Sequence, residues 1–132
     1  MDEDIPKGIG PHGKGRELDL MLAGEKPLAM FNDDIPADMD APEIAFAPYV
    51  DQGRFVKREI TVPCSLPTRT SLRYYFYALP GEEWRMERMI KIQKDFFERN
   101  AQTTQEREKE IGRLLGYEDK DIQVFIKRWF AP

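Results

Sequence analysis

Residues 72–79 have the sequence Leu-Arg-Tyr-Tyr-Phe-Tyr-Ala-Leu, and Pro80-Gly81 leads from them into a long amphipathic segment. Successive side chains of a strand point to opposite faces, so this stretch carries large residues on both sides. Such a strand fits the middle of a sheet better than its edge. We therefore predict a central aromatic strand, with Leu72, Tyr74, Phe76 and Ala78 on one face and Arg73, Tyr75, Tyr77 and Leu79 on the other.

The segment after the aromatic strand is predicted to form a helix over residues 81–99. Glu82 and Glu83 lie in its first turn, where carboxylates interact favourably with the helix dipole. Apolar side chains recur at helical spacing and form a wide stripe for packing. Trp84 falls outside this stripe, and we expect it to pack back on the aromatic strand.

Two further helices are predicted toward the C-terminal end. Thr103 with Glu106 three positions later fits a capping box, so the first of them begins there and ends at Gly116. The second begins at about Glu118. Its apolar residues follow the spacing i, i+3, i+4, i+7, i+8: Ile122, Phe125, Ile126, Trp129 and Phe130.

Prolines divide the chain before the aromatic strand into short pieces. A short helix with one apolar face is expected near residues 17–23, and Gly24 is placed to end it with a positive φ angle. Pro63 is expected to end the last strand of this part. Apolar and alternating patterns predict strands over residues 27–31, 44–47 and 55–62.

These elements predict an α+β fold. It consists of a small, mostly antiparallel sheet of three to four strands, preceded by a short helix and covered by three C-terminal helices. A length of 132 residues is close to that of one ordinary domain, so we expect a single domain over 1–132. Its expected parts are a flexible Gly/Pro-rich arm, a helix plus the sheet, and a helical part, at residues 1–15, 16–79 and 81–130.

The composition argues against several classes of protein. The chain is 41% hydrophobic and 33% charged, and no apolar run approaches the roughly 18 residues of a membrane span. The N-terminus is acidic, where a secretion signal would be basic and then apolar. Cys64 is the single cysteine, so neither an internal disulfide nor a cysteine-based zinc site can form. We expect a cytoplasmic protein without a metal or a cofactor.

The charge of the chain is uneven. Residues 1–50 have eleven acidic and four basic residues, a net charge of −7, whereas the whole chain has −4. Carboxylates crowd the proline-rich connection at residues 32–48, which lacks the alternating ligands and central glycine of an EF-hand loop. Long connections often carry binding surfaces. We therefore expect a partner to bind the carboxylates of this connection and the aromatic side chains of the last helix. These residues are Asp33, Asp34, Asp38, Asp40, Phe125, Trp129 and Phe130.

One alternative is a small enzyme. Lys14 and Arg16 lie in a glycine-rich approach to the first helix, where an anion could be bound. Glu17 and Asp19 occupy the first turn of that helix and oppose such a site. His12 is the single histidine, so a catalytic centre would have to be built from dispersed carboxylates. The balance leans against an enzyme, and we expect no catalytic residue.

A second alternative is a DNA-binding regulator. Residues 104–130 have the spacing of a helix-turn-helix, with a small residue at Gly112 and a turn glycine at Gly116. The start of the second helix would present Glu118, Asp119 and Asp121 to the phosphates, which opposes the main source of DNA affinity. A nucleic-acid partner is therefore disfavoured.

The leading hypothesis is a small soluble, non-enzymatic interaction protein. Inhibitors, immunity proteins, antitoxins and accessory subunits are of this kind. The expected partner is another protein, a second copy of this chain included, and not a membrane.

Overall fold

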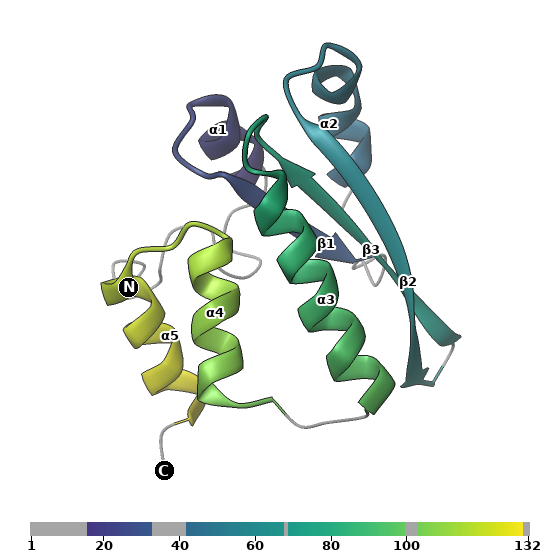
Figure 1. Ribbon diagram of the computed structural model, residues 1–132, viewed down its shortest axis with the longest axis vertical. Helices are drawn as coiled ribbons and strands as arrows, with labels where there is room; N and C mark the ends of the chain where they lie inside the picture. Colours follow the sequence, from purple (N-terminus) through teal and green to yellow (C-terminus); the bar gives the residue numbers. More distant parts are fainter. Residues whose placement is uncertain (1–15, 33–41, 68, 100–102, 131–132) are drawn as a thin grey trace.

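The computed structural model describes residues 16–32, 42–67, 69–99 and 103–130. Within them the chain forms a three-stranded antiparallel sheet with five helices (Figure 1). In chain order the elements are α1 (Arg16–Leu22), β1 (Leu28–Asn32), α2 (Pro42–Asp51), β2 (Val56–Leu66), β3 (Arg69–Ala78), α3 (Glu83–Arg99), α4 (Gln105–Leu114) and α5 (Asp119–Phe130). The predicted α+β fold is confirmed.

The aromatic strand β3 lies in the centre of the sheet, whose strand order is β1-β3-β2. Its two faces contribute to two separate clusters of buried side chains, as the alternation predicts. Tyr74 and Phe76 belong to the larger cluster, which also contains Met86 and Met89 of α3. Tyr75 and Tyr77 belong to the smaller cluster on the opposite face. Both faces of β3 are thus buried by helices.

The larger cluster lies between the sheet and the C-terminal helices. Figure 1 shows α3 running across the sheet, α4 beside it and α5 outermost. Ile111 and Leu115 bring the α4 region into the same core. The buried side chains of α5 are Ile122 and Ile126, and α5 packs on α4.

The smaller cluster lies under α1 and α2. Met21 of α1 and Phe46 of α2 are buried there with Phe55 and the two tyrosines of β3. Gly24 ends α1 with φ of 76°, as predicted.

The predicted strand at residues 44–47 is wrong, because this segment belongs to helix α2. Pro42 begins the helix, a position where proline's fixed φ fits and its missing N–H removes no helical bond. The spacing of Phe46, Tyr49 and Val50 is i, i+3, i+4, and these three side chains face the smaller cluster. Pro48 lies inside α2 and hides this periodicity in the sequence.

Three smaller predictions are corrected as well. Strand β2 continues through Pro63 to Leu66, with a shift of register that accommodates a proline in an edge strand. The N-cap of α4 is Thr104, whose hydroxyl accepts the backbone N–H of Arg107, and not Thr103. Trp84 does not pack on the aromatic strand, since its side chain is 56% exposed.

Candidate interaction surface

The most deeply buried contact of helix α2 with the sheet is made by Phe46. The ring of Phe46 stacks on that of Tyr77 with centroids 4.3 Å apart, and it meets Phe31 and Phe55 at 5.5 and 5.6 Å. Aromatic pairs at these separations add to the free energy gained from burial. Phe46 therefore fixes which side of α2 faces the sheet.

The opposite side of α2 is also apolar, although it faces solvent. Ile44 is 68% exposed, the highest value among the large hydrophobic side chains of the described residues. Ala47 and Pro48 are exposed beside it, at the i+3 and i+4 positions, and Asp51 follows at the end of the helix. A helix on a protein surface normally turns a polar face to water. The outer face of α2, defined by Ile44, Ala47 and Pro48, departs from that rule.

Pro48 adds an unusual backbone feature to this face. A prolyl nitrogen has no hydrogen, so α2 cannot give the carbonyl of Ile44 its usual i+4 donor. Pro48 therefore removes one i+4 backbone hydrogen bond from the interior of α2.

The sequence that contains α2 is acidic. Residues 27–53 contain six acidic residues and neither lysine nor arginine. Among the described residues, Glu43 of α2 makes an ion pair with Lys57 of β2 at 3.4 Å, and the guanidinium of Arg54 lies 5.5 Å from the ring centroid of Tyr49. Two basic side chains that follow α2 in the sequence therefore lie against it.

Trp84, the second exposed large hydrophobic side chain, has a local structural role. It lies at the start of α3, and the guanidinium of Arg85 lies 4.6 Å from its ring centroid. Arg85 in turn donates to the carbonyls of Arg113 and Leu114 at 2.8 and 3.1 Å, at the end of α4. Trp84 thus covers an arginine that joins α3 to α4.

Most of the predicted binding residues cannot be placed. Asp33, Asp34, Asp38, Asp40 and Lys14 lie outside the described residues. Arg16 begins α1 and Trp129 lies in α5, but their side chains are likewise outside the described part.

Phe125 and Phe130 can be placed, and both are half-buried in α5. Among the described side chains of α5, Val124 is exposed, at 36%. It lines a shallow hollow with Gln123, Ile126 and Lys127. Ile44, which is more exposed than Val124, was not among the predicted binding residues.

Lys26 is a buried cation whose pKa departs strongly from that of an ordinary lysine. Its ammonium donates to the carbonyl of Leu115 at 3.0 Å and lies 4.4 Å from the ring centroid of Tyr117. Burial lowers the pKa of Lys26 to about 8, while the nearby charge of Glu17 acts in the opposite direction. Lys26 joins the segment between α1 and β1 to the end of α4.

The described part of the chain contains no group of three or more His, Cys, Asp or Glu side chains that could hold a metal ion. None of the helices described is long and apolar enough to cross a bilayer. At the start of α5, Glu118 and Asp119 are exposed, so the second helix of the hairpin presents negative charge.

Comparison of this chain with protein-family models, curated proteins and solved structures gives no significant match.

Proposed function

We propose that this chain is a non-enzymatic protein that acts by binding another protein, and that the outer face of α2 is its binding surface. The partner would present an apolar groove for Ile44, Ala47 and Pro48, with basic residues at its rim. Inhibitors, immunity proteins, antitoxins and accessory subunits all work through a surface of this type.

The observation that carries the proposal is the exposure of Ile44 on a helix whose opposite side is already anchored. Phe46 buries one side of α2, so Ile44 cannot also reach the core. An amphipathic or apolar helix laid in a groove is a common mode of recognition, read through residues at i, i+3 and i+4. Ile44, Ala47 and Pro48 have that spacing.

The acidic composition of residues 27–53 supports the choice of partner. Complementary charge at a rim speeds association and selects among partners more than it adds affinity. For a partner with a basic rim, the association rate is expected to fall as the salt concentration rises. The apolar contact of Ile44 would show itself in the dissociation rate.

The test compares two matched substitutions in the full chain. Ile44→Asp places a carboxylate on the outer face of α2, whereas Val124→Asp places the same group on the exposed side of α5. Each protein is immobilised and exposed to lysate of the source cells, and the bound proteins are quantified by mass spectrometry. We expect a partner retained by the unmodified chain and by Val124→Asp, and reduced roughly tenfold or more by Ile44→Asp.

Two further measurements make the outcome decisive. Far-UV and near-UV circular dichroism must be the same for both variants, so that a loss of binding is not a loss of folding. Sedimentation at several concentrations shows whether the partner is a second copy of the chain. Retention of every bound protein, and of any self-association, by Ile44→Asp would contradict the proposal.

A further inference from the structure

The side-chain amide of Gln93 has a fixed orientation. Its oxygen accepts a hydrogen bond from Nη2 of Arg107 at 3.0 Å. An arginine guanidinium has donors but no acceptor, so the amide oxygen and not the nitrogen must face it. Arg107 is itself held, because Nη1 donates to Thr103 and Glu108 and the guanidinium lies 4.0 Å from the ring centroid of Phe96.

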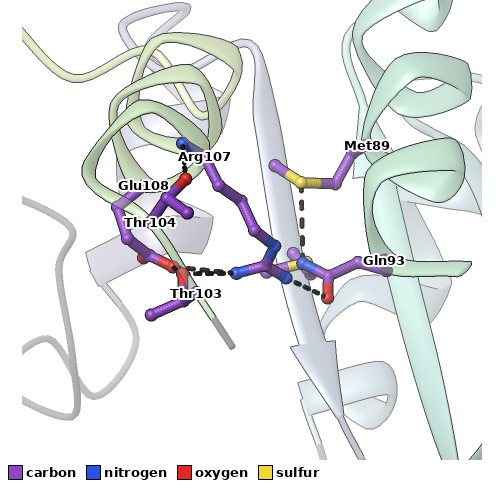
Figure 2. A network of polar contacts seen from close by, with 7 residues as sticks. Met89, Gln93, Thr103, Thr104, Arg107 and Glu108 are labelled. Carbon is purple, nitrogen blue, oxygen red and sulfur yellow. Dashed lines mark hydrogen bonds and ion pairs between the residues drawn. The ribbon is translucent and has the colours of Figure 1, made fainter. Parts of the chain in front are cut away.

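With the oxygen held by Arg107, the amide nitrogen of Gln93 points at two thioethers. Nε2 lies 3.5 Å from the sulfur of Met30. It lies 3.9 Å from the sulfur of Met89, and Figure 2 shows this contact beside the hydrogen bond to Arg107. Thioether sulfur is a weak acceptor. Gln93 is buried, so water does not supply a better one. The core between β1 and α3 thus contains a buried amide donor whose hydrogen-bond acceptors are two weakly accepting thioether sulfurs.

We propose that Met30 is a site of reversible oxidation to methionine sulfoxide, and that the amide N–H of Gln93 is placed to donate a hydrogen bond to the sulfoxide oxygen. Oxidation of a buried methionine ordinarily disrupts packing, because it introduces a polar oxygen into an apolar site. At Met30 the sulfoxide oxygen would find the N–H of Gln93 within reach. The modified side chain would then be tied to α3 by a strong hydrogen bond in place of a weak one.

The exposures of the methionines separate Met30 from its neighbours. Met30 is half-buried, whereas Met21, Met86 and Met89 are almost completely buried. A hydroperoxide transfers one oxygen atom to the Met30 sulfur as its O–O bond breaks. The sulfur is oxidised by two electrons, and the peroxide is reduced to water or an alcohol. A methionine sulfoxide reductase reverses the step.

The first test treats the folded full chain with hydrogen peroxide and follows each methionine by peptide mass spectrometry. We expect Met30 to gain oxygen roughly tenfold faster than Met21, Met86 and Met89, since reactivity follows access. In parallel, the side-chain amide protons of Gln93 are observed by NMR. They are expected to shift downfield and to exchange more slowly with solvent once Met30 is oxidised. Unchanged Gln93 amide resonances after oxidation of Met30 would overturn the proposal.

The second test uses two variants that keep the shape of the site. Gln93→Glu retains an acceptor for Arg107 but removes both N–H donors, and Met30→Leu removes the sulfur. Oxidised unmodified protein should melt within about 2 °C of its reduced form, whereas oxidised Gln93→Glu should lose about 5 °C. Met30→Leu should be insensitive to peroxide at this site. Equal losses in the unmodified chain and Gln93→Glu would contradict the role of Gln93, and the NMR result decides alone if that variant does not fold.

Discussion

Gly112 of α4 and Ile122 of α5 approach so closely that a Cβ atom on the glycine would lie 2.8 Å from Cγ1 of Ile122. We expect Gly112→Ala to destabilise the protein by about 1 kcal/mol, because overpacking outweighs the better helix propensity of alanine. Urea unfolding measures this. Adding Ile122→Val should recover part of the loss through a favourable coupling energy. Strictly additive effects would show that the two residues do not constrain each other.

Gly116 and Gly53 offer a matched pair in the left-handed region, with φ of 89° and 75°. A Cβ at Gly116 would overlap the ring of Pro27, whereas nothing lies within 4 Å of one at Gly53. Gly53→Ala should cost about 1 kcal/mol for the backbone conformation alone. Gly116→Ala should cost at least about 2 kcal/mol more, since backbone and proline must move apart. Similar losses in thermal unfolding would argue against tight docking of Pro27 on the α4–α5 turn.

Tyr77 and Tyr74 differ in what their hydroxyl groups contact. The hydroxyl of Tyr77 is buried with no hydrogen-bond partner in the described structure, whereas that of Tyr74 is hydrogen-bonded to Asn32. Tyr77→Phe should therefore leave stability unchanged or raise it by about 1 kcal/mol, because no bond is lost. Tyr74→Phe should lower it by about 1 kcal/mol. Chemical denaturation of both variants gives the comparison, and a destabilised Tyr77→Phe would mean that its hydroxyl is satisfied.

Lys26 makes stability depend on pH. Its pKa is about 8 in the folded chain, against 10.5 for an ordinary lysine. Between these values the unfolded chain binds more protons, so the free energy of unfolding rises with pH. The rise from pH 8 to 9.5 should be about 1.5 kcal/mol. Above pH 10 it is opposed by Tyr77 and Tyr117, because burial raises their pKa values in the folded state.

The control for this pH dependence is Lys26→Met, which keeps the length of the side chain without the titrating group. Urea midpoints measured from pH 7 to 9.5 should show the Lys26-dependent rise only in the unmodified protein. An identical pH profile for the variant would place the dependence elsewhere.

The sheet could be predicted because its centre carries a strong local signal. Residues of β3 alternate between two large apolar sets, and that pattern is sufficient to define a central strand. Helix α2 could not be predicted in the same way, because Pro48 is read as the end of an element and not as its interior. The N-cap lies at Thr104 because local side-chain contacts occupy Thr103. The hydroxyl of Thr103 is engaged with the side chains of Glu108 and Arg107.

The candidate surface was harder to predict than the fold. Ile44 falls within a predicted strand, and its exposure follows only from the side of α2 that Phe46 occupies. The contact between Gln93 and Met30 joins residues 63 positions apart. No spacing in the sequence reports such a pair, because it depends on where α3 crosses β1.

The hydrogen bond from Lys26 to Leu115 also bears on the order in which the chain is synthesised. These residues are 89 positions apart, so the first lies in a nascent chain long before its acceptor has been made. Strand β1 likewise has no partner until β3 follows it from the ribosome. A polypeptide released before α4 is complete would leave the ammonium of Lys26 in water and the apolar side chains beside it exposed. Residues from β3 to Leu115 must therefore all be synthesised before the first strand and Lys26 have their final partners.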